Sequence, residues 1–449
     1  MGNTKGAQKP MSVLTKQQRV AKLARVHRTR AFTSLHHYID YEWLYRAYQL
    51  TRKDGAVGVD GKTARQYEQA LKSNLEDLLG RIKTGTYRAP AIRRVYIPKG
   101  NGKRRPLGIP TFEDKIVQRA VVMLLEPIYE QDYYTCSYGF RRGRSAHNAL
   151  RNLRNKIMDE GGRWIFDVDI QKYFDTIDHT QLRKFLARRV VDGVIRKLID
   201  KWLKAGVLES GQLQKSIQGT PQGGVISPLL SNIYLHYVLD EWFDKAVKPR
   251  MKCRCSMTRF ADDFVMVFED HNDVHRVKRV ISKRFARYNL VIHPDKTKLV
   301  DFRFRYRKEN RRKSKAISFD FLGFTHYWGK SRRGKDIVCQ KTAKDRFRKA
   351  LNEINAFCRN NRHKPLDEQW SRLNRKLVGH YAYFGITGNH KSLRNLEHQT
   401  CRLWRKWLSR RSRKSYIPWE RFKLLLLRFP IARPKIYHQY YKPNQLVRQ

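Results

Sequence analysis

Two adjacent aspartates inside an apolar segment constrain the fold of this chain more than any other feature. Asp262 and Asp263 interrupt residues 258–268 (TRFADDFVMVF), which are otherwise mostly apolar and β-prone. Burying a charge in such a segment costs free energy unless a cation or another partner compensates. We therefore expect two short strands joined by an acidic turn. The alternative is a plain hairpin turn, because Asp favours turns without any ligand.

A separate strand is expected to end at a third acid, Asp169. Residues 163–170 (RWIFDVDI) alternate in the manner of a strand. Helical patterns follow at 179–190 and at 194–204, with Gly206 placed as the C-cap of the second helix. The apolar face of the strand would carry Trp164, Phe166, Val168 and Ile170.

Carboxylates at the ends of different strands would suit divalent cations. Mg²⁺ prefers one or two carboxylates together with substrate phosphates. Two such ions, about 3.5–4 Å apart, promote attack by a hydroxyl and departure of a phosphate. Asp169, Asp262 and Asp263 therefore predict phosphoryl transfer with two Mg²⁺ ions, for which Mn²⁺ would be a substitute.

The charge of the chain points to a polyanionic partner. Its 449 residues include 95 Lys+Arg and 40 Asp+Glu, a formal net charge of +55. With 41% hydrophobic and 12% aromatic residues, the chain is too apolar to be a disordered polycation. Nucleic acid is the leading partner and an anionic membrane surface a distant second. No apolar run reaches 18 residues, so we expect no membrane-spanning helix.

Composition also suggests three regions. Residues 1–35 form a basic N-terminal arm, for which a transit peptide is the alternative. Residues 36–325 read as mixed α and β, and residues 326–449 as helical with a basic, aromatic tail. An amphipathic helix is expected from Ala343 to Phe357. The six cysteines show no disulfide or zinc pattern, which predicts a reducing, intracellular location.

A series of motifs in fixed order resembles the reverse transcriptases encoded by group II introns, and it spans roughly residues 40–440. The motifs are GVDGKT (58–63), YIPKGNGKRRPLGIPTFEDKIVQRAV (96–121), SYGFRRGRSAHNAL (137–150), DVDIQKYFDTIDH (167–179), GTPQGGVISPLLSNIYL (219–235), RFADDFVMV (259–267), HPDKTKLV (293–300), FDFLGF (319–324) and LNRKLVGHYAYFGI (373–386).

The resemblance implies an α+β fold: a right-hand polymerase, with fingers and a palm built on an antiparallel sheet, followed by an α-helical thumb or maturase (X) domain. It implies an RNA-directed DNA polymerase that also assists splicing of its intron and copies the intron into DNA during retrohoming. The implied partners are group II intron RNA, an RNA template with a DNA primer, target DNA and dNTPs, with no membrane. The implied location is the bacterial cytoplasm, at the nucleoid, with an organelle less favoured.

The resemblance also assigns roles to single residues. Asp169, Asp262 and Asp263 would be the catalytic metal ligands, and Ile170 would offer a backbone carbonyl. Phe174 would pack under the sugar of the incoming nucleotide and exclude a 2′-hydroxyl. Core packing is the alternative role for Phe174, and Tyr173 is the competing choice for the sugar contact.

Other nucleotide contacts would come from Lys99, Arg105, Gln222 and Lys296. Lys99 and Arg105 flank a Gly-Asn-Gly turn, where two cations would grip a triphosphate. A solvated hairpin is the alternative, because Lys103 and Arg104 are equally charged. A surface lysine is likewise the alternative for Lys296.

Nucleic-acid contacts are expected at two glycines and four basic residues. The glycines would let the backbone approach the templating base and sugar. The basic residues belong to the loop at 303–315 and to the helix that follows. The full set is Gly223, Gly224, Arg311, Arg312, Lys344 and Arg348.

Two alternative functions remain at this stage. One is an RNA-binding maturase without polymerase activity, although all three aspartates are present. The other is a free-standing group II-like enzyme domesticated for DNA repair or defence. No HNH-type motif follows the maturase-like region, so we expect no endonuclease domain and priming from an existing DNA 3′ end.

Overall fold

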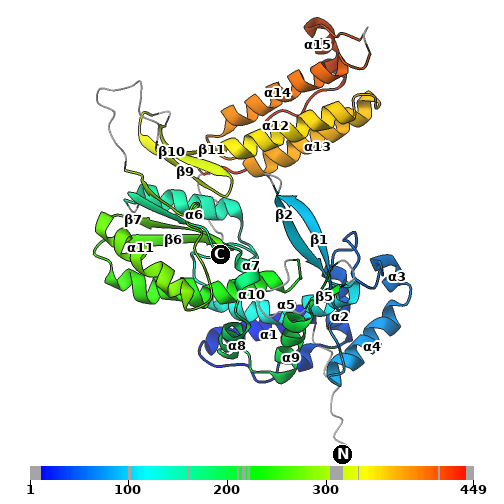
Figure 1. The fold of residues 1–449 in the computed structure, drawn as a ribbon, viewed down its shortest axis with the longest axis vertical. Helices are drawn as coiled ribbons and strands as arrows, with labels where there is room; N and C mark the ends of the chain where they lie inside the picture. The colour runs from blue at the N-terminus through cyan, green and yellow to red at the C-terminus, as the bar shows by residue number, and fades with distance from the viewer. Residues whose placement is uncertain are drawn as a thin grey trace, which may run out of the picture.

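The computed structural model describes residues 12–99, 103–159, 161–209, 212–214, 219, 223–303, 317–331, 333–412 and 415–440. Its described elements form a mixed α+β architecture with three sheets and a separate group of C-terminal helices (Figure 1). Among these helices, none combines the length and apolarity needed to cross a bilayer.

The first sheet, called the central sheet, is antiparallel and has the order β6-β7-β3-β8. Its strands are β3 (Trp164–Val168), β6 (Cys255–Phe260), β7 (Asp263–Phe268) and β8 (Lys298–Asp301). Phe260 pairs with Asp263, which leaves a two-residue loop, and Val168 pairs with Phe264. The two strands and the acidic turn expected from the sequence are therefore confirmed. The register brings Asp169 and Asp263 to the same end of the sheet.

One face of the central sheet contributes Phe166, Val168 and Phe264 to a large hydrophobic core, which also contains residues of helices between positions 13 and 286. The helix expected at 179–190 ends at Ala187. The second expected helix ends at Lys204 with Ala205 as its C-cap, so the expected C-cap Gly206, with a φ of +67°, is one residue further along. The helices are α1 (Val13–Val26), α2 (Tyr41–Leu50), α3 (Ala64–Glu68), α4 (Leu71–Lys83), α5 (Phe112–Asp132), α7 (Tyr173–Thr176), α8 (His179–Ala187), α9 (Gly193–Lys204), α10 (Ser227–Leu235) and α11 (His271–Ala286).

Short turns of other helix types complete this region. Two are 3₁₀ turns, at His36–Tyr38 and Lys248–Arg250. Two are π-helical stretches that continue from α10, at His236–Asp240 and Phe243–Val247.

The opposite face of the central sheet is covered as well. Helix α6 (Ala146–Asp159) and a three-stranded bridging sheet pack there around Ile165 and Val265. The bridging sheet has the order β11-β10-β9, with β9 (Ser318–Phe321), β10 (Phe324–Lys330) and β11 (Asp336–Thr342). Ile165, which alternation places on the polar face with Asp167 and Asp169, is therefore fully buried.

The remaining sheet, called the hairpin sheet, has the order β2-β1-β4-β5. Its strands are β1 (Ile92–Lys99), β2 (Lys103–Ile109), β4 (Val207–Glu209) and β5 (Gln212–Gln214). The β1–β4 pair is parallel, whereas the other pairs in the three sheets are antiparallel. The β1–β2 hairpin rises toward the C-terminal helices (Figure 1).

The C-terminal helices, called the helical unit, have a separate core around Leu377, Trp404 and Phe422. They are α12 (Lys344–Asn360), α13 (Leu366–Phe384), α14 (His390–Leu408) and α15 (Trp419–Arg428). The expected amphipathic helix thus matches α12. Residue 325, where the sequence suggested a boundary, lies inside β10.

The end of the described chain returns to the first part of the molecule. The Arg151 guanidinium of α6 donates to the carbonyl of Gln439 at 3.0 Å, and the rings of His147 and His438 stack at 3.4 Å. This C-terminal strap, residues 429–440, therefore fastens the helical unit to α6.

Trp404→Ala tests the separate core of the helical unit. Trp404 is fully buried, and its indole N–H donates to Gln369 at 3.0 Å. We expect a loss of about 3–5 kcal/mol, the usual cost of truncating a buried Trp, measured by denaturant unfolding followed with hydrogen exchange in α12–α14. Trp407→Ala, on the same helix but half-buried, is the control with a smaller loss. Equal effects of the two variants would contradict the assignment of this core.

Candidate active site

The turn between β6 and β7 holds two of the expected metal ligands. This acidic turn, residues 260–263, has Ala261 and Asp262 as its loop residues. Ala261 adopts a φ of +58°, a left-handed conformation that costs a non-glycine residue free energy. Asp263 exposes part of its side chain, although protein surrounds it on most sides.

Asp169 is fixed by the segment that precedes β8. Its carbonyl accepts the backbone N–H of His293 at 2.8 Å, and its own N–H donates to the Thr297 hydroxyl at 3.4 Å. Ile170, next to it, is buried and forms a β-bridge with Ile292. The end of β3 therefore has a defined backbone position beside the acidic turn.

The carboxylates of Asp169, Asp262 and Asp263 lie close enough to affect one another. Burial raises the pKa of Asp262 above its ordinary value, and the charge of Asp169 raises it further. Burial raises the pKa of Asp263 to about 6, with added repulsion from Asp262 and Asp169. A cation bound between these carboxylates would relieve their mutual repulsion.

The Lys296 ammonium supplies one such cation. Its Nζ lies 3.1 Å from both carboxylate oxygens of Asp169, and its charge lowers the pKa of Asp263 against the effect of burial. A positive charge is therefore already held at the position where the carboxylates converge. Carboxylate oxygens that carry excess negative charge are also the hard ligands that Mg²⁺ prefers.

The carboxylates do not form a complete metal cage. Within the described residues, no group of three or more His, Cys, Asp and Glu side chains is arranged to hold a metal ion alone. Mg²⁺ commonly keeps several waters and uses substrate phosphates as ligands. An open set of ligands therefore fits an ion that binds together with a nucleotide.

Asp169 and Asp263, but not Asp262, open into a cleft of about 870 Å³ between the central sheet and the helical unit. Asp169, Asp263 and Lys296 line it from the sheet side, and Arg346 and Tyr383 line it from the helices. The turn between β9 and β10 forms another wall. The cleft therefore joins the acidic site to a basic helical surface.

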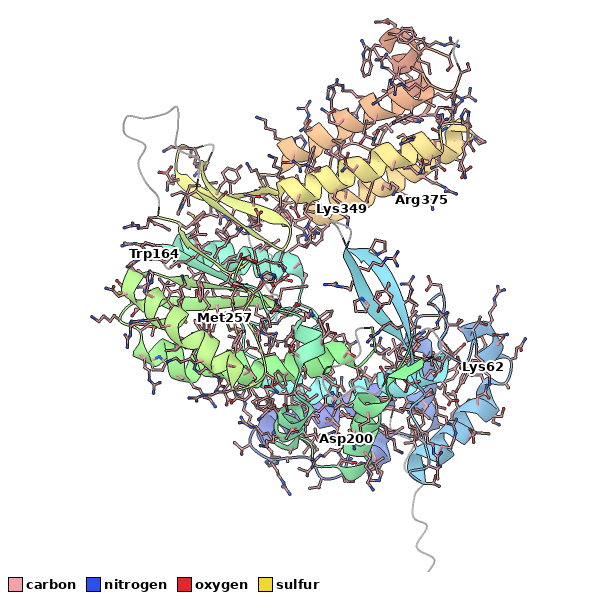
Figure 2. The ribbon with its side chains drawn as sticks, in the orientation of Figure 1. Lys62, Trp164, Asp200, Met257, Lys349 and Arg375 are labelled. Carbon is pink, nitrogen blue, oxygen red and sulfur yellow. The ribbon has the colours of Figure 1, made fainter. Side chains whose placement is uncertain are left out.

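The sequence prediction missed several residues of this cleft. Burial raises the pKa of Asp167 to about 7, with repulsion from Asp263, so Asp167 is a fourth acid near the site. Arg346 and Lys349 on α12 line the cleft, whereas the predicted Lys344 and Arg348 are exposed and do not line it. The three-residue spacing of Arg346 and Lys349 was the available signal, but the rotation of α12 was unknown. Lys349 lies at the end of α12 that faces the central sheet (Figure 2).

Phe174 and Tyr173 have different environments. Tyr173 is 3% exposed, and its hydroxyl donates to the carbonyl of Ser231 at 2.6 Å. Phe174 is half-buried, with its ring centroid 5.4 Å from that of Tyr173. Tyr173 is therefore a core residue, and Phe174 is the member of the pair with free surface.

Arg105 and Lys99, the two cations expected to bind a triphosphate, lie on the strands of the β1–β2 hairpin. Arg105 is exposed and pairs with Ile97, and its charge lowers the pKa of Asp262 against the effect of burial. Lys99 pairs with Lys103 at the end of the hairpin.

The glycine-rich loop before α10 approaches the same hairpin. Gly223 has a φ of +117°, and a Cβ at this position would collide with the carbonyl of Gly108 on β2. Gly224 is buried. Gln222, Arg311 and Arg312 lie outside the described residues.

Asp263→Asn should stabilise the metal-free protein at high pH. The native pKa of Asp263, about 6, exceeds its ordinary value of 3.8, so the aspartate loses stability as pH rises from about 4 to 6. The amide removes this loss, and partial exposure limits the gain to about 1 kcal/mol or less. Thermal melts in EDTA at pH 4 and pH 8 measure the difference, with Asp200→Asn on the remote α9 as control (Figure 2). A gain at pH 4 equal to that at pH 8 would contradict the electrostatic cause.

Comparison with known proteins supports a single family. A family model for reverse transcriptase (RNA-dependent DNA polymerase) matches residues 97–326. Protein YkfC of Escherichia coli is 40% identical over 257 residues, covering 50% of this chain and 68% of YkfC. Group II intron-encoded protein LtrA of Lactococcus lactis is 37% identical over 269 residues, covering 59% of this chain and 43% of LtrA.

A solved structure of telomerase from Candida albicans, in complex with a fragment of telomeric RNA, also matches. The match covers 81% of this chain and 65% of the telomerase chain, with 14% sequence identity and a TM-score of 0.42. The sequence matches are the stronger finding, since the family model spans half of the chain. The chain belongs to the group II intron reverse transcriptase/maturase family and contains an RNA-dependent DNA polymerase domain.

Proposed function

We propose that the cleft between the central sheet and the helical unit extends a DNA primer on an RNA template, with Asp169, Asp262 and Asp263 as ligands of two Mg²⁺ ions. The observation that carries this proposal is that Asp169 and the acidic turn lie together at one end of the central sheet, where the charge of Asp169 raises the pKa of Asp262 and of Asp263 and the Lys296 ammonium contacts Asp169. In this proposal the central sheet is the palm, the hairpin sheet belongs to the fingers, and the helical unit is the thumb.

The reaction joins the primer 3′-oxygen to the α-phosphorus of a dNTP and breaks the bond to the β-phosphate, so that pyrophosphate leaves. The ions, when bound, would stabilise the charge that develops on both oxygens. Asp169, Asp262 and Asp263 would hold these ions at the end of the central sheet. Ile170 would add its backbone carbonyl.

Basic side chains of this protein would neutralise the negative charge of the nucleotide. Arg105 and Lys99 would bind the triphosphate from the hairpin. Lys296, whose ammonium contacts Asp169 in this structure, would also contact the nucleotide phosphates. Gln222 would hydrogen-bond near the base, and Gly223 and Gly224 would admit the template backbone.

The basic side of the cleft would hold the nucleic-acid duplex. Arg346 and Lys349 line it, and Lys344 and Arg348 extend the basic surface along the exposed side of α12. Neutralising phosphates with such residues supplies most of the non-specific binding of nucleic acids. Arg311 and Arg312 would extend this contact from their loop.

We also propose that the protein binds a group II intron RNA, assists its splicing and copies it into DNA at a target site. The supporting observations are the relationship to LtrA, described as a group II intron-encoded protein, and a net charge of +55, larger than a primer and template alone require. The bacterial relatives favour action at the nucleoid. Absence of a foldable intron beside the gene would favour a domesticated enzyme instead.

Asp262→Ala should abolish primer extension and leave RNA binding largely intact. The variant removes one metal ligand but none of the basic residues that contact phosphate. Single-nucleotide incorporation with Mg²⁺ and a filter-binding assay measure the two properties. Asp200→Asn, on the remote α9, is the control and should retain both. Wild-type protein that extends no primer would contradict the proposed function.

Phe174→Ala should admit ribonucleotides. If the ring blocks the space of a 2′-hydroxyl, its removal should lower discrimination against rNTPs by about 10- to 200-fold, as for other small changes in an apolar pocket. The ratio of kcat/KM for dNTP and rNTP measures this effect. Tyr173→Phe is the control, because it removes only a buried hydrogen bond to Ser231. Unchanged selectivity in Phe174→Ala would assign this ring to core packing.

A further inference from the structure

A completely buried arginine lies immediately before the acidic turn. Arg259, in β6, has 0% of its side chain exposed, and so does its ion-pair partner Asp240. Nε donates to one oxygen of Asp240 at 2.7 Å and Nη2 to the other at 2.5 Å. A buried ion pair of this kind gives little net stability compared with well-packed apolar residues. Its presence in the core therefore calls for another reason.

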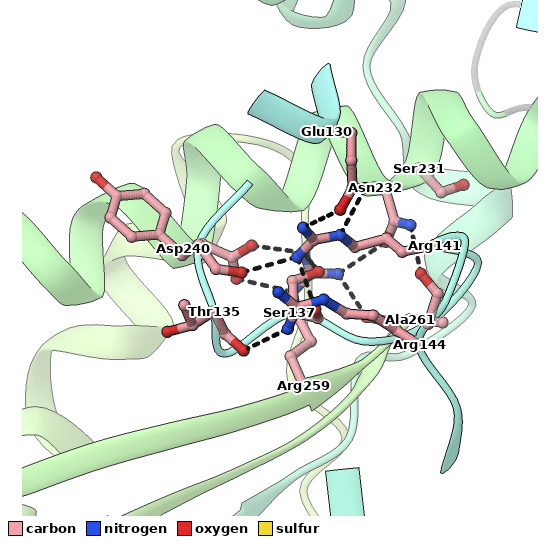
Figure 3. Close-up of polar contacts among 12 residues, drawn as sticks. Glu130, Thr135, Ser137, Arg141, Arg144, Ser231, Asn232, Asp240, Arg259 and Ala261 are labelled. Atoms are coloured by element: carbon pink, nitrogen blue, oxygen red, sulfur yellow. Dashed lines mark hydrogen bonds and ion pairs between the residues drawn. The ribbon is translucent and has the colours of Figure 1, made fainter. Parts of the chain in front are cut away.

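The remaining donors of Arg259 provide that reason. Nη2 also donates to the Ser137 hydroxyl at 2.8 Å, and Nη1 donates to Asn232 at 3.0 Å. The second donor of Nη1 reaches the carbonyl of Ala261 at 3.0 Å (Figure 3). All five N–H groups of the guanidinium are thus used, and one of them holds the residue directly before Asp262.

Ala261 needs such support because its backbone is strained. A φ of +58° persists in a non-glycine residue only where the surroundings enforce it. Gly139 packs against the other side of the turn, where a Cβ would collide with the Ala261 nitrogen. Asn232, which accepts from Arg259, donates its amide to the Gly139 carbonyl at 2.6 Å. The hydrogen bonds of Arg259 and Asn232 therefore fix both the Ala261 carbonyl and Gly139, which packs against Ala261.

The main chain of Arg259 is held by residues 136–138. Its N–H donates to the Cys136 carbonyl at 2.8 Å, and its carbonyl accepts the Tyr138 N–H at 2.9 Å. Arg141 closes this segment through Glu130 and the carbonyls of Tyr134 and Ser137. Arg259 therefore cannot shift without moving β6 or residues 136–138.

We propose that Arg259 is a positioning residue that fixes the acidic turn, so that Asp262 and Asp263 present their carboxylates to metal ions in one geometry. This inference rests on the proposed function of the turn. Arg259 touches no reacting atom; it acts through the Ala261 carbonyl. Its charge also opposes the effect of burial on the pKa of Asp262.

Arg259→Lys tests the proposal. Lysine keeps the charge opposite Asp240 but has three donors on a compact ammonium, so it cannot reach all the acceptors. Because misplacing reacting groups by about 1 Å can cost about 100-fold in rate, we expect kcat for nucleotide incorporation to fall about 100-fold. KM for dNTP should change much less. The affinity for Mn²⁺, titrated by electron paramagnetic resonance without nucleotide, should fall about tenfold.

Arg189→Lys is the matched control. Arg189 is 2% exposed, pairs with Asp132 at 2.8 Å, and donates to the carbonyls of His27 and Arg30, far from the acidic turn in sequence and contacts. It should lose thermal stability like Arg259→Lys but keep kcat and Mn²⁺ affinity. Equal kcat and equal Mn²⁺ affinity in the two variants would overturn the proposal and leave Arg259 a structural residue.

Asn232→Ala provides a second variant that keeps the ion pair. It removes one neutral acceptor of Arg259 and the tie to Gly139, so a smaller fall in kcat, about tenfold, is expected together with weaker Mn²⁺ binding. If Arg259→Lys does not fold, wild-type kcat in folded Asn232→Ala overturns the proposal. Wild-type protein that extends no primer contradicts the proposed function, whereas unchanged Mn²⁺ affinity in both variants contradicts the positioning role alone.

Discussion

The pairing of β3 with β7 is the constraint on which the candidate site depends. Val168 lies opposite Phe264, so the next residues, Asp169 after β3 and Asp263 at the start of β7, lie at the same end of the sheet. A slip of one residue in this register would turn one carboxylate to the other face, because side chains alternate along a strand. Two hydrophobic cores, one on each face, make such a slip costly. Packing far from the cleft thus determines where the charges meet.

Much of this arrangement was predictable from residue patterns. The acidic turn, the strand before Asp169 and helix α12 follow from alternation, periodicity and the cost of burying charge. Residue patterns did not predict that Ile165 is buried, because the bridging sheet that covers it is formed by residues 318–342, more than 150 positions later. Likewise the cleft contains Arg346 and Lys349 rather than Lys344 and Arg348, since the orientation of a helix depends on its tertiary contacts.

Arg259 shows a signal that was present and overlooked. A single arginine inside the β-prone run that leads to Asp262 implies either an exposed edge or a buried partner, since a buried guanidinium must be paired. Of its partners, Asn232 lies on α10 and Asp240 lies on the π-helical stretch that continues from α10. Sequence distance hides such a pairing, whereas the structure identifies the acidic turn as one end of a continuous polar network.

The C-terminal strap has a consequence for biosynthesis. His438 and Gln439 dock on α6, whose residues leave the ribosome almost 300 positions earlier. Synthesis at about 5–20 residues per second leaves α6 waiting for tens of seconds before its partner exists. The contact that fastens the helical unit to α6 therefore forms only after all four helices of that unit have been made. Folding order alone therefore makes the docking of the strap on α6 one of the last tertiary contacts that the described part of the chain can form.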